Sequence, residues 1–139
     1  LVLLFLLAGA GAYIAQQASE LARARASILA AQENAAQPLR AGRDAFEKGD
    51  YQMAETHFSG LVAREPQNSE AHLWLGRAQL AKRDFASAAQ SFEQAIRLQP
   101  AMYEAYLGAA GAYEAAGDTQ KARRALSLAG EQLRQAAPR

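Results

Sequence analysis

The sequence contains no cysteine and only two histidines, four prolines and one tryptophan. The absence of cysteine excludes disulfide bonds and thiolate metal sites. Neither histidine, His57 or His72, stands in a catalytic pattern, and phosphate loops, zinc spacings and nucleophile elbows are missing from the sequence. With 15 basic and 14 acidic residues, the net charge of +1 gives no electrostatic footprint for nucleic acid. The sequence therefore predicts no enzyme activity, cofactor, metal site or nucleic-acid partner.

Charge is also absent from the first 15 residues, LVLLFLLAGAGAYIA. A membrane-spanning helix needs about 20 apolar residues, so this run is short by roughly five. It has three interpretations: the end of a transmembrane anchor that begins upstream, a secretory signal segment, or a buried helix. We predict an anchor or signal segment over residues 1–16, with the lipid bilayer as the partner of residues 1–15.

Small residues four positions apart within this run would let another membrane helix approach closely. They are Ala8, Gly11, Ala12 and Ala15. The arginines that follow, Arg23 and Arg25, favour a cytoplasmic location for the rest of the chain under the positive-inside rule. The export-like character of the run favours the opposite side. We predict a single-pass inner-membrane protein with a periplasmic domain, and the cytoplasmic side stays open.

Residues 17–34 contain no proline or glycine and consist of good helix formers. Ile14, Leu21 and Ile28 recur every seven residues and form one apolar stripe. We predict a helical stalk. Its stripe either packs on the domain that follows or forms a short coiled coil with another chain, so a homo-oligomer stays open.

From residue 35 the sequence repeats with a step of 34 residues, the separation of Pro66 and Pro100. This step aligns small residues, aspartates and large apolar residues in three consecutive units. The aligned sets are Gly42, Gly76 and Ala110; Asp50, Asp84 and Asp118; Ala54, Ala88 and Ala122; and Phe58, Phe92 and Leu126.

Each unit reads as two helices joined by a turn. The small residues allow the two helices to approach closely, and the large apolar residue fills the space between neighbouring pairs. The aspartate is placed to cap the second helix through its side-chain oxygen. Gly49 and Gly117 can adopt the left-handed conformation that ends a helix, where the middle unit has Arg83. Proline then ends the second helix.

This pattern resembles the tetratricopeptide repeat, whose signature is W-x2-L-G-x2-Y, then A-x3-F, then P. The middle unit matches it at Leu75, Gly76, Ala88, Phe92 and Pro100, with His72 at the first aromatic position. The resemblance implies an all-α, right-handed solenoid of three repeats over residues 35–68, 69–102 and 103–136. It also implies a protein-binding scaffold that holds a partner segment in a concave groove.

On the first helix of each unit, three positions that repeat at the 34-residue step share one face, because they are spaced i, i+4 and i+7 along the helix. If the family geometry holds, this is the concave face, and a partner with apolar anchors and carboxylates fits it. The predicted partner-binding residues are Leu39, Arg43, Phe46, Leu73, Arg77, Leu80, Leu107 and Glu114. Family members that clamp chaperone carboxylates use lysines and asparagines, and of the corresponding residues here only Arg43 is a plausible anion ligand.

The last helix carries three leucines that cannot all face inward: Leu126, Leu128 and Leu133. We predict a contact face there, to another protein or to a second copy. The predicted function is a membrane-anchored adaptor or assembly factor of a bacterial envelope complex that binds a protein partner. The alternative is a permanent structural subunit of a larger membrane complex.

Overall fold

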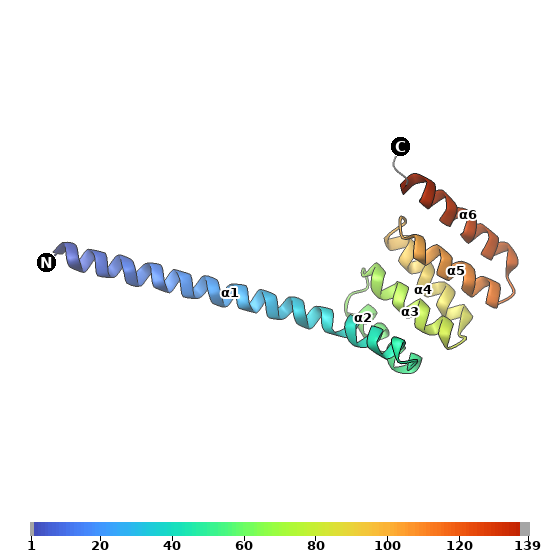
Figure 1. Ribbon diagram of the computed structural model, residues 1–139, viewed down its shortest axis with the longest axis horizontal. Helices are drawn as coiled ribbons and strands as arrows, with labels where there is room; N and C mark the ends of the chain where they lie inside the picture. Colours follow the sequence, from blue (N-terminus) through green and yellow to red (C-terminus); the bar gives the residue numbers. More distant parts are fainter. Residues whose placement is uncertain (1, 137–139) are drawn as a thin grey trace. The chain divides into compact units, whose positions relative to one another are not determined.

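The computed structural model describes residues 2–136, with side chains from residue 10 onward except that of residue 35. Within this range every regular element is an α-helix (Figure 1). The helices are α1 (Val2–Glu47), α2 (Tyr51–Arg64), α3 (Ser69–Ala81), α4 (Phe85–Leu98), α5 (Tyr103–Ala115) and α6 (Thr119–Ala136).

The chain divides into a first unit, residues 1–37, and a second unit, residues 38–139. The described part of the first unit is a single helix, the larger part of α1, and the side chains of residues 10–34 are exposed. Its stripe residues Ile14, Leu21 and Ile28 are 67%, 74% and 57% exposed. The residues predicted for membrane-helix packing, Gly11, Ala12 and Ala15, are exposed as well, and the side chain of Ala8 lies outside the described residues.

No helix among the described residues combines the length and the apolar character needed to cross a membrane. The predicted transmembrane anchor over residues 1–16, and with it the predicted bilayer contact of residues 1–15, is therefore not supported. Gln16 and Gln17 follow Ala15 directly, and the side chains of residues 10–34 are exposed.

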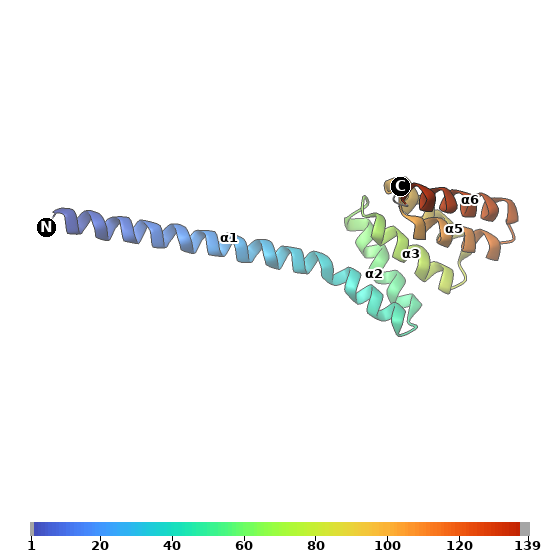
Figure 2. The same ribbon diagram turned by 45° about the horizontal axis from the view of Figure 1, so that its top comes forward.

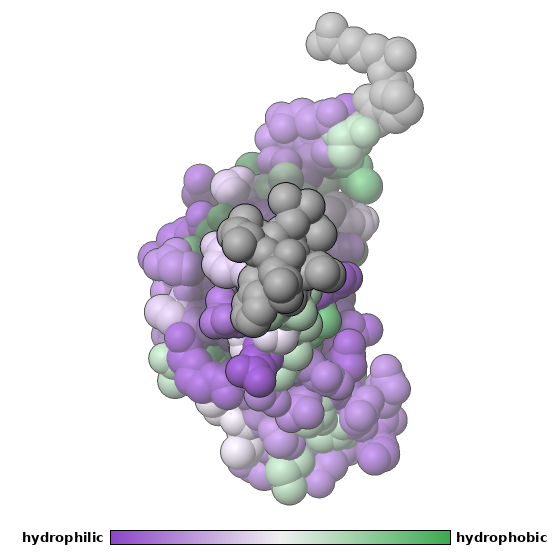
Figure 3. Space-filling model, turned by 90° about the vertical axis from the view of Figure 1, so that its left-hand side faces the viewer, coloured by the Kyte–Doolittle hydropathy of each residue, from purple (hydrophilic) through white to green (hydrophobic). Residues whose placement is uncertain are grey.

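In the second unit, helices that follow one another in the chain lie against one another. The contacts are α2 with α3, α3 with α4, α4 with α5 and α5 with α6, and α3 also touches α5. Figures 1 and 2 show α3 and α5 side by side, with α6 beside α5. On the face that Figure 3 shows, hydrophilic residues dominate and hydrophobic ones form small separate patches. The second unit is thus a stack of helix pairs, an all-α solenoid.

Two phenylalanine rings determine how closely these helices approach. Phe58 and Phe92 are fully buried, with no exposed surface. A Cβ atom on Gly42 would lie 2.5 Å from the Phe58 ring, and one on Gly108 would lie 2.3 Å from the Phe92 ring. Gly76 meets the same Phe92 ring, at 2.9 Å from a Cβ placed there. The predicted small residues are needed because aromatic rings occupy the space of their side chains.

Aspartates cap the second helix of each pair, as the spacing predicts. The Oδ1 atoms of Asp50 and Asp118 each accept a hydrogen bond at 3.0 Å, from the backbone N–H groups of Met53 and Lys121. Asp84 does the same for Ser87 at 3.3 Å. Hydrogen bonding by Ser87 lowers the pKa of the Asp84 carboxyl, because it favours the charged form.

The turn before each cap uses a left-handed residue. Gly49 and Gly117 have φ angles of +79° and +85°, and Arg83 adopts 67° at the equivalent position. An L-residue with a Cβ pays about 1 kcal/mol or more for this conformation. The middle repeat therefore carries local strain that the other two avoid.

A further polar contact stabilises the start of α3, and a similar one stabilises the start of α5. His72 Nε2 lies 3.0 Å from the carbonyl oxygen of Pro66, and the Tyr106 hydroxyl donates to the carbonyl oxygen of Pro100 at 3.1 Å. A carbonyl can only accept, so the first contact requires the proton on Nε2. His72 thus does the work of the aromatic residue that the repeat signature places there.

We predict that Gly76→Ala destabilises the fold, because its methyl group would overlap the Phe92 ring. Overpacking of this kind costs about 1–3 kcal/mol in the free energy of unfolding. Urea unfolding followed by circular dichroism measures it. The matched control is Gly60→Ala in α2, where no atom lies within 4 Å of the new Cβ. That variant should be stabilised by roughly 0.5–1 kcal/mol, and equal effects of the two variants would contradict the packing argument.

We also predict that Arg83→Gly raises the free energy of unfolding by about 1 kcal/mol, because glycine adopts a positive φ without strain. The reciprocal variant Gly117→Arg should lower it by a similar amount. The same urea titration measures both changes. If Arg83→Gly is less stable than the unchanged chain, the arginine side chain contributes more to the free energy of unfolding than its backbone strain removes.

Candidate partner-binding face

The single tryptophan of the chain lies at the centre of a cluster of aromatic and cationic side chains. The guanidinium carbon of Arg43 lies 4.9 Å from the Trp74 ring centroid, and that of Arg77 lies 4.6 Å from it. The ring of Phe58 stacks on Trp74 at 5.9 Å, and that of Phe46 meets its edge at 5.7 Å. Both guanidinium groups thus make cation–π contacts with the Trp74 ring, which itself packs on two phenylalanine rings.

Helix geometry explains this cluster. Trp74 and Arg77 are three residues apart on α3, so their side chains share one face. Arg43 and Phe46 have the same spacing near the end of α1, within the second unit. Phe58 reaches the cluster from α2, the helix that lies between these two in the chain. The cluster, which we call the Trp74 cluster, therefore joins the first repeat to the second.

Neither arginine has a carboxylate partner in the described part of the chain. The ion pairs found there are Arg64 with Glu65 at 3.9 Å, Lys121 with Asp118 at 3.4 Å, and Lys82 with Glu55. Arg43 is exposed and Arg77 is half-buried. Two unpaired guanidinium groups on one aromatic ring are suited to bind a carboxylate, because arginine donates two parallel hydrogen bonds to it.

The leucines predicted for the same face differ in exposure. Leu73 is 7% exposed and belongs to the core beside Phe92, whereas Leu107 is 40% exposed. Leu39 and Leu80 are half-buried and pack against the core. Of this row, Leu107 therefore offers the largest free apolar surface to a partner. Glu114, also predicted for this face, is exposed on α5.

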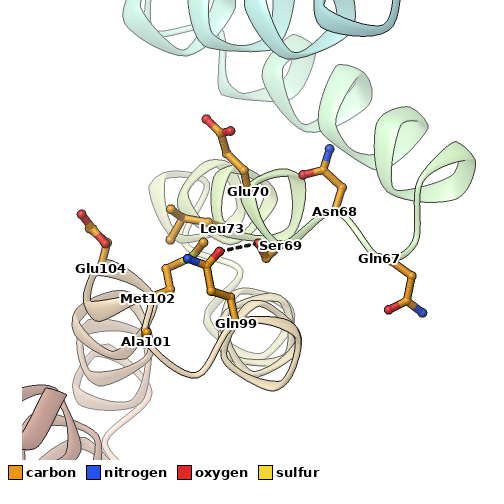
Figure 4. Close-up of a pocket in the computed structure, with 9 residues that line it drawn as sticks. All are labelled: Gln67, Asn68, Ser69, Glu70, Leu73, Gln99, Ala101, Met102 and Glu104. Atoms are coloured by element: carbon orange, nitrogen blue, oxygen red, sulfur yellow. Dashed lines mark hydrogen bonds between the residues drawn. The ribbon is translucent and has the colours of Figure 1, made fainter. Parts of the chain in front are cut away.

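A hollow of about 590 Å³ opens beside Leu73, between the starts of α3 and α5 (Figure 4). Glu70 and Glu104 stand at its rim, and Met102 contributes apolar surface. The Ser69 hydroxyl donates to the Gln99 side-chain oxygen at 2.9 Å across its floor. Carboxylates thus flank the N-terminal ends of these helices, and the unpaired arginines of the Trp74 cluster lie further along the first helices.

The described residues contain no group of three or more His, Asp or Glu side chains that could hold a metal ion. The three leucines predicted as a C-terminal contact face are exposed on α6, with Leu126 at 50%, Leu128 at 37% and Leu133 at 51%. Ala125 and Ala129 of the same helix are buried. The outward face of α6 is therefore apolar at these three positions.

Sequence reasoning placed Arg43 and Arg77 in the site but missed the role of Trp74. Trp74 stands two residues beyond the position of the signature tryptophan, which His72 occupies. The available signal was its spacing of three residues from Arg77, which puts both on one helical face. The stacking of Arg43 on the same ring depends on contact between two helices, which spacing alone does not provide.

Two models of the tetratricopeptide repeat match the chain, one over residues 39–93 and one over residues 79–139. No curated protein sequence compared with the chain matches it. Among solved structures, the TPR2B domain of yeast Sti1 in complex with pHsp70 superimposes with a TM-score of 0.71 at 22% identity. The match covers 73% of this chain and 82% of that one.

Two further structures are similar. The first TPR of Spaghetti bound to the HSP90 peptide SRMEEVD gives a TM-score of 0.68 at 20% identity, covering 70% of this chain and 78% of that one. A chain of the CopN–Scc3 complex gives 0.72 at 22% identity, covering 76% of this chain and 62% of that one. At such identities the likeness concerns the fold. Together the two family models span residues 39–139 and coincide with the stacked helix pairs, so the chain belongs to the tetratricopeptide repeat family.

Proposed function

We propose that this chain is a protein-interaction scaffold that captures a partner segment on the face centred on the Trp74 cluster. A carboxylate of the partner binds between the guanidinium groups of Arg43 and Arg77. An apolar side chain of the same segment rests on Leu107, further along the face. The chain performs no chemistry in this role and acts as an adaptor.

The observation that carries this proposal is the pair of unpaired arginines over one tryptophan ring, at 4.9 and 4.6 Å. Both guanidinium groups lie on one ring, so their like charges repel each other, and an anion that contacts both relieves this repulsion. Stacking on Trp74 holds both side chains, so less side-chain entropy is lost when the partner binds. The two arginines on Trp74 therefore give the proposed site both its affinity and its selectivity for an acidic segment.

The fold neighbours support the use of such a face for peptides. The Spaghetti domain holds the peptide SRMEEVD, which is rich in carboxylates, and the Sti1 domain is in complex with pHsp70. The lysine and asparagine clamp by which some family members hold chaperone carboxylates does not carry over to this chain residue by residue, because only Arg43 matches it in character. We therefore propose an acidic partner segment and no particular chaperone.

A second candidate function, a permanent structural subunit, is supported by α6. Leu126 occupies the repeat position of Phe92, whose ring is covered by α5, yet Leu126 is 50% exposed. Leu133 is exposed as well, so a helix of another protein could pack there as α5 packs on α4. The predicted envelope setting and periplasmic placement depend on residues 1–16 and form no part of either proposal.

We predict that Arg43→Glu with Arg77→Glu weakens binding of acidic peptides at least tenfold, because it replaces attraction by repulsion. A random peptide library displayed on phage and selected on the full chain should yield sequences with carboxylates beside apolar side chains. Synthetic copies of these peptides should change the fluorescence of Trp74, the only tryptophan, and the titration gives their affinity.

The matched control is Arg97→Glu with Arg123→Glu, which alters the net charge equally on exposed positions of α4 and α6. Its affinity should stay within about twofold of the unchanged chain, since neither arginine belongs to the Trp74 cluster and salt screens exposed charges. Selected peptides without carboxylates, or equal losses in both double variants, would contradict the proposed role of the Trp74 cluster.

A further inference from the structure

A second hollow, of about 310 Å³, lies between α4 and α6, with α5 as its floor. We call it the α4–α6 hollow. It lies among the second helices of the repeats and shares no residue with the Trp74 cluster. Its walls are mainly apolar and are formed by Ile96, Tyr106, Ala109, Tyr113 and Leu128.

The repeat register explains why the hollow exists. Ala109 stands 34 residues after Leu75, which is buried and packs in the core, so the third repeat lacks most of a leucine side chain here. Ala125 likewise stands 34 residues after Ser91. In the middle repeat the Ser91 hydroxyl donates to the Gln79 side-chain oxygen at 2.7 Å. At two positions of this lining the third repeat thus has smaller side chains than the middle repeat.

Both tyrosines present the hollow with ring surface, and the hydroxyl group of each is already hydrogen-bonded within the chain. The Tyr106 hydroxyl donates to the Pro100 carbonyl oxygen at 3.1 Å, and the Tyr113 hydroxyl donates to the Glu93 carboxylate. Burial, followed by this hydrogen bond to Glu93, raises the pKa of Tyr113 to about 12. The Tyr113 phenol therefore stays neutral, and the hollow offers aromatic and aliphatic surface to an apolar side chain.

The rim of the hollow is cationic on the α6 side, where Lys121 and Arg124 stand. Lys121 pairs with Asp118 at 3.4 Å, whereas Arg124 has no carboxylate within ion-pair distance in the described part of the chain. Glu93 on the opposite, α4 side keeps its negative charge while it accepts a hydrogen bond from the Tyr113 hydroxyl. The lining therefore holds two cations, both on α6, and one carboxylate on α4, and a carboxylate entering on the α6 side would find a partner in Arg124.

We infer that the α4–α6 hollow is a second docking site, which takes a protein segment presenting one large apolar side chain next to a carboxylate. The apolar side chain fills the space left by Ala109 and Ala125, and the carboxylate binds Arg124. This site is separate from the Trp74 cluster, so the scaffold holds two segments at once, one on its first helices and one on its second helices. Two weak contacts on one scaffold combine into a strong one when a single partner supplies both.

The test uses two short peptides, N-acetyl-Glu-Phe-Glu-amide and N-acetyl-Lys-Phe-Lys-amide, titrated into the full chain labelled with carbon-13 in its methyl groups. We expect the acidic peptide to shift the methyl signals of Ile96 and Leu128 saturably, and the basic peptide to shift them little at the same concentration. Ala109→Leu, which restores the side chain of the middle repeat, should weaken binding at least tenfold. Arg43→Glu with Arg77→Glu should leave these shifts unchanged, which separates this site from the proposed function.

Arg124→Glu is the second variant and leaves the packed core untouched, so the test stands even if Ala109→Leu unfolds the protein. It should abolish the preference for the acidic peptide. Equal shifts from both peptides, or shifts that persist in both variants, would overturn the inference. So would concentration-dependent self-association detected by sedimentation that Ala109→Leu removes, because a second copy would then occupy the hollow.

Discussion

The insertion of the Phe92 ring between Gly76 and Gly108 is the constraint on which the rest of the repeat domain depends. A single methyl group at either glycine would lie within 2.9 Å of the ring, so α3, α4 and α5 meet at a distance that only hydrogen atoms allow. Phe58 does the same against Gly42 at the end of α1. Close-packed interiors tolerate little change of volume, so these contacts determine the spacing of the helices and therefore of the surface residues they carry.

Both proposed binding surfaces follow from this spacing. On the first helices it brings Arg43 of one repeat and Arg77 of the next to the same Trp74 ring. Between α4 and α6, which α5 bridges, it leaves the α4–α6 hollow. The hollow lies beside Ala109, which stands in the third repeat where the second repeat has Leu75. The repeat-defining residues build the scaffold, and the residues that vary between repeats give each surface its chemistry.

The repeated spacing predicted much of the fold, because caps, turns and small residues act locally or at a fixed step along the chain. Asp50, Asp84 and Asp118 cap the helices that the sequence assigned to them. The prediction of the partner-binding residues stays untested. Leu73, predicted to line the groove, is 7% exposed, because its position beside Phe92 of α4 places it in the core. The Trp74 cluster and the α4–α6 hollow arise from contacts between helices, which periodicity along one helix does not reveal.

The central claim is that a partner segment binds on the face shared by Trp74 and Leu107. The most direct measurement replaces Leu107, exposed on that face, with the photo-crosslinking residue benzoylphenylalanine and irradiates the chain with an acidic peptide selected on it. Mass spectrometry then identifies the attached residue. The account predicts attachment from position 107 to an apolar residue near the peptide's carboxylate, and none from the same residue placed at exposed Gln120 of α6. Attachment from position 120 with none from 107 would contradict it.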